Sequence, residues 1–129
     1  MLPGMKQMLM VGLGGSLGSI ARYWLGGLIQ QKVPDLRFPL GTFTINLLGC
    51  LAIGILAGFV EKRGSFSPDV RLFLFTGICG GFTTFSAFAN EGVFLLRRSE
   101  TPTALLYAGA SVAFGFLAVW LGFKLVFRP

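Results

Sequence analysis

One stretch of the chain decides the fold: GGFTTFSAFANE, residues 80–91. It lies inside a strongly apolar segment, yet it opens with two glycines, which weaken helices, and continues with a run of hydroxyl side chains. In a membrane, a glycine-rich interruption frees backbone carbonyl groups that protein, water or an ion must satisfy, because lipid cannot. We therefore expect a helix broken at residues 80–84, Gly80 to Thr84, and treat this stretch as the candidate functional centre.

The composition around this stretch is that of an integral membrane protein. A length of 129 residues fits one domain, and 53% hydrophobic residues with only 12% charged residues exclude an ordinary soluble protein. The charged residues cluster in short intervals and leave four apolar segments, each close to the roughly 20 residues that a membrane-spanning helix needs. The sequence predicts an all-α membrane protein, a single domain with four transmembrane helices over about residues 8–29, 40–60, 68–96 and 102–127.

Several classes of function are excluded by the residues that could carry them. The net charge is +6, but the basic residues lie between apolar spans and form no continuous basic face, so we expect no nucleic-acid partner. The chain has no histidine, and Cys50 and Cys79 lie in the middle of predicted spans without CxxC spacing, which argues against a zinc site or a disulfide framework. Without a metal cluster or a nucleophile beside a base, we do not expect an enzyme.

The first predicted span is interrupted by one charge, Arg22. Gly14, Gly18 and Arg22 are spaced by four residues and therefore share one ridge of the helix. Small residues at this spacing allow another helix to approach closely. Arg22 either reaches the interface or pairs structurally, which we favour, or contacts an ion directly.

The second and fourth spans carry polar side chains at helical spacing. In the second span, small or polar residues recur every four positions: Thr42, Asn46, Cys50, Gly54 and Gly58. An amide at mid-membrane depth is costly without partners, so Asn46 either holds helices together or lines a wet path, and both interpretations stay open. In the fourth span, Tyr107 and Ser111 are four residues apart; the commonest roles of such residues are an interfacial tyrosine and a serine bonded to the preceding turn.

The third span places two rings and a carboxylate on one face. Phe85, Phe88 and Glu91 follow each other at three-residue intervals, which brings them to the same side of a helix.

Charges flanking the spans give a weak orientation signal. The face that holds the N-terminus, the second connection and the C-terminus carries Lys6, Lys62, Arg63, Arg71, Lys124 and Arg128, and the opposite face carries Lys32, Arg37, Arg97 and Arg98. This bias is too small for the positive-inside rule to fix one orientation. Insertion in both orientations would permit an antiparallel dimer, which would also bury the polar stripes.

These residues resemble those of the Fluc (CrcB) fluoride channels. The motifs that carry the resemblance are GGSLGSIARY at residues 14–23, GT at 41–42, NLLG at 46–49, TG at 76–77, and GGFTTFSAF at 80–88 with Glu91. The resemblance covers nearly the whole chain, including its length and its four spans, and the motif in the third span is the most specific part.

The resemblance implies a dual-topology antiparallel homodimer in the cell (inner) membrane, with two pores that export cytoplasmic fluoride passively. By position, the ring edges of Phe85 and Phe88 would face the anion, and a structural sodium ion (Na+) would be held at the centre by the main-chain carbonyls of Gly80 and Thr83 from both subunits. Polar positions along the route would be Asn46, Ser111, Tyr107, Thr42 and Glu91, with Arg22 near a pore vestibule.

Three positions depart from the family pattern, and one other class remains as an alternative. Phe82 stands where leucine is usual, Ala87 where threonine is usual, and Gly115 where some members have a second serine. The alternative is a small multidrug-resistance-type dual-topology transporter, which would need a carboxylate in the first span, where this chain has only Arg22.

Overall fold

The computed structural model describes residues 4–64 and 66–128, and every regular element in that part of the chain is helical. The first, second and fourth spans are α1 (Met5–Gln31), α2 (Leu40–Arg63) and α6 (Thr101–Val126). The third span is divided into α3 (Pro68–Arg71), a π-helical segment η1 (Leu72–Cys79), α4 (Gly80–Phe82) and α5 (Phe85–Arg97). The all-α prediction is confirmed, with bounds within a few residues of those expected.

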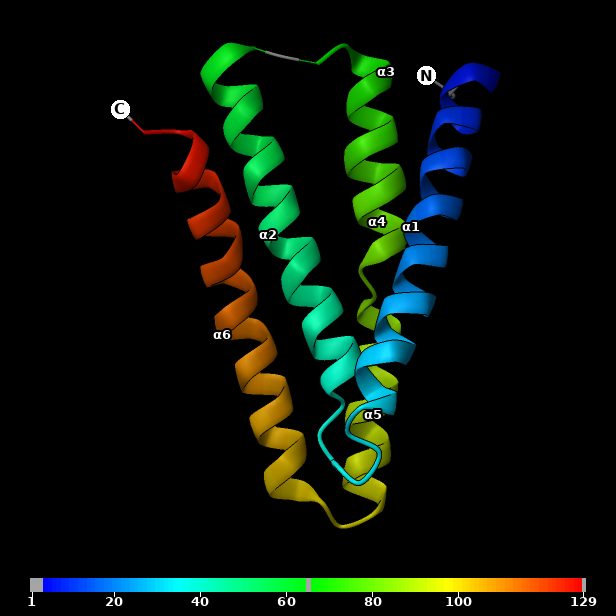
Figure 1. Cartoon of the computed structure of the whole chain (residues 1–129), viewed down its shortest axis with the longest axis vertical. Coiled ribbons are helices and arrows are strands. Elements are labelled where there is room, and N and C mark those ends of the chain that lie inside the picture. Colours follow the sequence, from blue (N-terminus) through cyan, green and yellow to red (C-terminus); the bar gives the residue numbers. More distant parts are fainter. Residues whose placement is uncertain (1–3, 65, 129) are drawn as a thin grey trace.

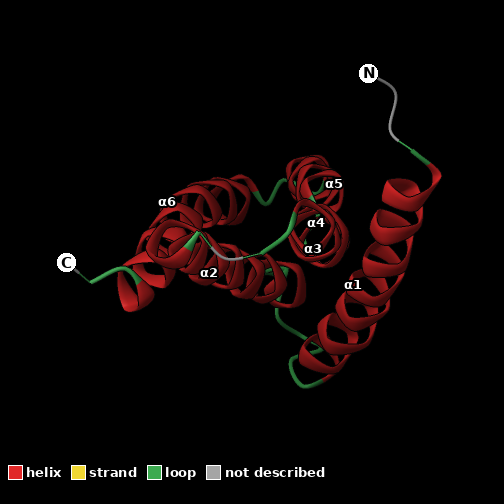
Figure 2. Cartoon of the chain, turned by 90° about the horizontal axis from the view of Figure 1, so that it is seen from above, coloured by secondary structure: helices red, strands yellow, loops and turns green. Residues whose placement is uncertain are grey.

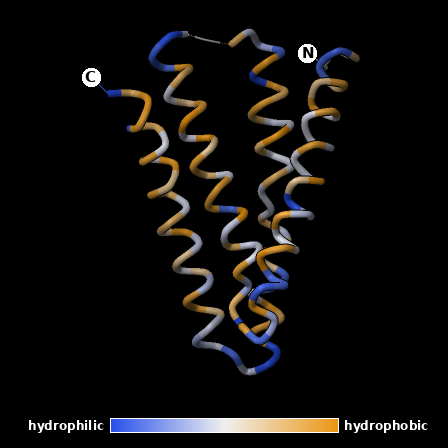
Figure 3. Tube along the Cα trace, viewed as in Figure 1, coloured by the Kyte–Doolittle hydropathy of each residue, from blue (hydrophilic) through white to orange (hydrophobic). Residues whose placement is uncertain are grey.

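The long helices run up and down between two ends of the molecule. Figure 1 shows the N-terminus, the C-terminus and the α2–α3 connection at one end, and the α1–α2 and α5–α6 connections at the other, as the charge count assumed. Hydrophilic residues concentrate at these two ends, and the helical segments between them are largely hydrophobic (Figure 3).

Three of the four helical spans are long and apolar enough to cross a membrane. They are Leu40–Arg63, Pro68–Arg97 and Thr101–Val126. The 27 residues of α1 are enough for a helix of about 40 Å, but Arg22, its glutamines and its many glycines make it less hydrophobic. A membrane-spanning fold is supported by the three helices, and α1 as the fourth span stays a prediction.

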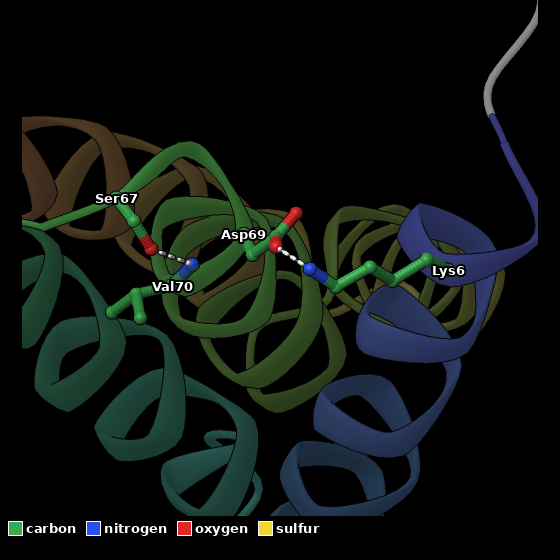
Figure 4. Close-up of polar contacts among 4 residues, drawn as sticks. All are labelled: Lys6, Ser67, Asp69 and Val70. Atoms are coloured by element: carbon green, nitrogen blue, oxygen red, sulfur yellow. Dashed lines mark hydrogen bonds and ion pairs between the residues drawn. The ribbon is translucent and has the colours of Figure 1, made fainter.

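The third span begins with a capped helix end that is tied to α1. Ser67 is the N-cap, its Oγ accepts a hydrogen bond of 3.3 Å from the Val70 N–H, and Pro68 occupies the first turn. Asp69 in the same turn forms an ion pair with Lys6 of α1, and Figure 4 shows these two side chains pointing toward each other across the two helices. The contact links the start of the third span to the start of the first.

Glycines bring the helices together in two pairs. A Cβ atom on Gly14 would lie 2.5 Å from the Phe73 carbonyl oxygen, and one on Gly18 would lie 2.2 Å from that of Ile78. The ridge predicted on α1 therefore does face another backbone, that of η1. In the second pair, a Cβ on Gly54 of α2 would lie 2.2 Å from the Val119 oxygen of α6. Figure 2 shows the result: α1 lies beside α3 and α4, and α6 lies beside α2 on the other side.

Candidate functional site

The break in the third span is confined to two threonines. Thr83 (φ −89°, ψ 157°) and Thr84 (φ −150°, ψ 112°) are extended, whereas Gly80 (φ −63°, ψ −38°) is still helical. The break lies inside the predicted window of residues 80–84, but the window was too wide, because the glycines do not interrupt the helix. A Cβ on Gly81 would lie 2.5 Å from the Gly15 carbonyl oxygen, so this glycine serves close packing against α1.

The threonine hydroxyls add hydrogen bonds on both sides of the break, beside the helical bond of 3.0 Å that the Thr83 N–H still donates to the Cys79 carbonyl. Thr83 Oγ1 donates to the Cys79 carbonyl at 2.9 Å. Thr84 Oγ1 accepts from the Ala87 N–H at 3.2 Å and so caps the start of α5. Side chains of this type compete with the backbone for its hydrogen bonds, which explains why the helix breaks at these residues rather than at the glycines.

Asn46 of α2 pairs with the backbone of the break. Its Nδ2 donates to the Thr84 carbonyl at 3.1 Å, and its Oδ1 accepts from the Thr84 N–H at 2.8 Å. Both backbone groups of Thr84 are thereby satisfied by one side chain from another helix. The first of the two roles left open for Asn46, holding helices together, is confirmed, while its part in a wet path stays a prediction.

Because of these contacts, two carbonyl oxygens lack the N–H donors that they would have in a continuous helix. In a continuous helix, the N–H of Thr84 would donate to the Gly80 carbonyl and the N–H of Ala87 would donate to the Thr83 carbonyl. Both N–H groups instead donate to side chains, those of Asn46 and Thr84. The oxygens released are those of Gly80 and Thr83, and uncharged carbonyl oxygens are ligands that suit a hard cation.

Arg22 bonds to the carbonyl between these two. Its Nε donates to the Gly81 oxygen at 3.0 Å, and the hydroxyl of Ser19 donates to the same oxygen at 3.4 Å. The structural pairing that we favoured for Arg22 is therefore present. Ser19 was missed by the sequence reasoning, although it lies three residues before Arg22 and thus on the same face of α1.

A second polar cluster joins α2, α5 and α6 through Glu91. Thr42 Oγ1 donates to Glu91 Oε1 at 2.7 Å, and the Tyr107 hydroxyl donates to Oε2 at 2.6 Å. Each carboxylate oxygen therefore accepts one hydrogen bond from a hydroxyl group. Tyr107 is fully buried, so an interfacial role for this residue is wrong.

The rings of α5 continue from this cluster in one line. The Phe88 ring lies 5.0 Å from that of Tyr107, and the Phe85 ring lies 5.7 Å from that of Phe88, measured between centroids. The predicted common face of Phe85, Phe88 and Glu91 is confirmed by these contacts. Phe85, the last ring of this series, is 80% exposed in the single chain.

Ser111 lies beside the rings with its hydroxyl unpartnered. Its Oγ is buried and has no hydrogen-bond partner in the described part of the chain. A buried polar group without a partner costs about 1–3 kcal/mol, so this hydroxyl gains from bonding a water or a ligand. Ser111 lines a cavity of about 350 Å³ that is also lined by Asn46, Phe85, Phe88, Gly80 and Thr83.

A larger cavity of about 760 Å³ opens toward the α1–α2 connection. Arg22, Thr42 and Glu91 line it, and Thr84 lines both cavities. Tyr107 lies between them, since it contacts Glu91 on one side and Phe88 on the other. Nine of the ten residues singled out from the sequence therefore line two neighbouring cavities, and Tyr107 contacts one lining residue of each, which sequence spacing alone did not predict.

Comparison with known proteins decides the family. Residues 9–123 match the model of a family described as CrcB-like protein, Camphor Resistance (CrcB). The chain belongs to the CrcB-like family. Proteins named fluoride-specific ion channel FluC are 52% identical to it over 122 residues in Methylobacillus flagellatus, covering 95% of each chain, and 47% identical over 118 residues in Nitratidesulfovibrio vulgaris, covering 92% of this chain and 94% of the relative.

The resemblance inferred from the motifs is thus confirmed over most of this CrcB-like chain. With its three long apolar helices and its relatives named as ion channels, it is a multi-pass membrane protein, and the expectation that it is not an enzyme is confirmed by the family.

Proposed function

We propose that this CrcB-like chain is a fluoride-selective channel that lets cytoplasmic fluoride leave the cell passively. The observation that carries the proposal is the smaller cavity, where the unpartnered hydroxyl of Ser111 meets the rings of Phe85 and Phe88. The relatives named as fluoride-specific channels support the choice of ion.

The chemistry of this cavity suits a small anion. Removing a bare ion from water costs many kcal/mol unless donors or positive partial charges replace the water. Aromatic rings carry their positive partial charge at the edge, so Phe85 and Phe88 can contact fluoride without holding it too tightly to leave. The Ser111 hydroxyl and the remaining N–H of the Asn46 amide supply conventional donors.

In a chain oriented with the larger cavity toward the cytoplasm, fluoride reaches this point from that cavity. Arg22 attracts the anion at the entrance, and the hydroxyls of Thr42 and Tyr107 come next along the route. Both hydroxyls point to Glu91, which therefore orients them, and each has to turn from the carboxylate to the passing anion. Glu91 is in this proposal a positioning residue that also keeps fluoride from being bound too strongly.

We propose further that two chains assemble as an antiparallel homodimer with two pores. The exposure of Phe85, the weak charge bias between the two faces and the exposed backbone at Gly80 support it. Cysteine replacing Gly64 in the α2–α3 connection, in a chain with Cys50 and Cys79 changed to alanine, is expected to react with an impermeant thiol reagent from both sides of the membrane. Labelling from one side alone would contradict the antiparallel dimer.

A structural sodium ion is the proposed ligand of the Gly80 and Thr83 carbonyls. Two chains would supply four such oxygens, and a buried cation would raise the local potential for an anion. Replacing sodium by N-methylglucamine is expected to lower the unfolding temperature of the dimer in detergent, and sodium is expected to restore it. Identical unfolding in both solutions would contradict the ion site without touching the channel proposal.

Efflux from proteoliposomes tests the channel itself. Vesicles loaded with fluoride are expected to empty when they contain the protein, while vesicles loaded with chloride retain their anion, and protein-free vesicles retain both. No fluoride efflux, or chloride efflux at the same rate, would overturn the proposal. A drug transporter of the small multidrug-resistance type gains no support, since α1 carries Lys6 and Arg22 as its only charges.

A further inference from the structure

The larger cavity carries charges of both signs around its wall. Its charged lining residues are Arg22, Arg37, Arg98, Glu91 and Glu100. Three of these residues contact only uncharged groups among the partners identified, so their charge is not neutralised. Arg22 donates a hydrogen bond to a carbonyl oxygen, Arg98 lies over the Phe94 ring at 4.2 Å, and Glu91 accepts hydrogen bonds from two hydroxyl groups.

The remaining two neutralise each other at the rim. Arg37 Nη1 pairs with Glu100 Oε1, which joins the α1–α2 connection to the residue immediately before α6. The Arg37 side chain is 74% exposed and that of Glu100 is 23% exposed. An exposed pair of this kind contributes only about 0–1 kcal/mol to stability, so stability alone gives little reason for it.

We propose that Glu100 limits the rate at which anions enter the larger cavity, by neutralising Arg37 at its rim. This inference rests on the proposed channel function and assigns the pair to its entrance. Arg22 and Arg98 attract an anion to the cavity, and a third uncompensated arginine would strengthen that field. Glu100 offsets the third charge and keeps the entrance only moderately positive.

The electrostatic argument predicts opposite changes in efflux rate for substitutions of the two partners. Glu100→Gln leaves Arg37 uncompensated and is expected to raise the initial rate of fluoride efflux, whereas Arg37→Gln leaves Glu100 uncompensated and is expected to lower it. One unit charge roughly 8 Å from the entering ion changes the rate by about twofold in water. The double variant restores the net charge and is expected to match the unchanged protein.

Measuring efflux at two ionic strengths distinguishes an electrostatic effect of the pair from a purely structural one. The effects are expected at about 10 mM salt, where the screening length is about 30 Å, and are expected to vanish at about 1 M, where it is about 3 Å. If the pair only tied the two connections together, both single variants would slow efflux, and they would do so at either salt concentration. Arg37→Lys keeps the charge but alters the fork of hydrogen-bond donors, and it is expected to behave like the unchanged protein.

The experiment measures initial fluoride efflux from proteoliposomes for the unchanged protein, both single variants, the double variant and Arg37→Lys, at low and high salt. Opposite, salt-dependent shifts support the proposal. Unchanged rates, shifts in the same direction or shifts that persist at high salt would overturn it. Failure of the unchanged protein to release fluoride would instead overturn the proposed function, and this inference with it.

Discussion

The two sides of the break in the third span are built in different ways. Before Thr83, η1 and α4 lie so close to α1 that backbone meets backbone, and a Cβ on Gly77 would lie 2.9 Å from the Gly14 Cα. After Thr84, α5 turns large and polar side chains toward α2 and α6, where Phe88 meets Tyr107 and Glu91 meets Thr42. The first half packs on α1 mainly through glycines, with Arg22 and Ser19 bonded to the Gly81 carbonyl, and the second half makes its contacts through large and polar side chains.

This difference shows how one helical span of 30 residues can both pack tightly against α1 and present polar side chains to α2 and α6. Close glycine packing fixes the position of η1 and α4 with few degrees of freedom, since backbone atoms cannot change rotamer. The extended residues Thr83 and Thr84 interrupt the helix, so α5 begins as a separate helix with Thr84 as its N-cap and with a different side facing its neighbours. The polar contacts of α5 with α2 and α6 can therefore be arranged without disturbing the packing against α1.

The largest effect is expected from filling the glycine contact in the first half. Gly18→Leu would place its Cβ 2.2 Å from the Ile78 carbonyl oxygen, and because backbone cannot move aside as a side chain can, we expect a loss of about 3 kcal/mol or more of stability. Thermal unfolding in detergent measures this loss. The matched control is Gly12→Leu on the same helix, where a Cβ meets nothing within 4 Å. Equal stability of the two variants would contradict backbone-to-backbone packing.

A smaller but more local effect is expected at the break itself. Asn46→Ala leaves the N–H and the carbonyl of Thr84 without their partner, at a cost of about 1–3 kcal/mol. Hydrogen exchange of the Thr84 amide should then speed up by about tenfold to a hundredfold. Asn90→Ala, at an exposed position of α5, serves as the control and should leave this amide unchanged. Protection that persists without Asn46 would show that the threonines alone hold the break.

The smallest effect is expected from one hydroxyl in the second half. Tyr107→Phe removes one of the two donors to Glu91 but keeps the ring packed on Phe88, so we expect a loss of about 1–2 kcal/mol of stability. Thermal unfolding measures it against Tyr23→Phe, because 85% of Tyr23 is exposed. If the two variants unfold alike, the Glu91 cluster does not stabilise the second half.

Local sequence patterns predicted those features that depend on neighbouring residues. The apolar runs placed the helices, the four-residue spacing of Gly14 and Gly18 indicated the close contact of α1, and the three-residue spacing of Phe85, Phe88 and Glu91 placed them on one face. Each is a property of one helix and its period.

Features that depend on contacts between distant residues were not predictable in this way. Helix propensity places the break at the glycines, but packing against Gly15 keeps Gly81 helical, and the break moves to the threonines. The pairing of Asn46 with Thr84 joins residues 38 positions apart, and the Arg37–Glu100 pair joins residues 63 apart. No periodic signal within a helix encodes either contact.

The central claim is that the ring edges of the second half form the path of the ion, and one measurement tests it most directly. Fluoride efflux from proteoliposomes is compared for Phe85→Ile and Phe116→Ile, two replacements of exposed rings, 80% and 77% exposed, on α5 and α6. An aromatic contact of roughly 1 kcal/mol predicts about a fivefold loss for Phe85→Ile, with unchanged assembly on size exclusion, and near-normal efflux for Phe116→Ile. Near-normal efflux of both variants would contradict the account.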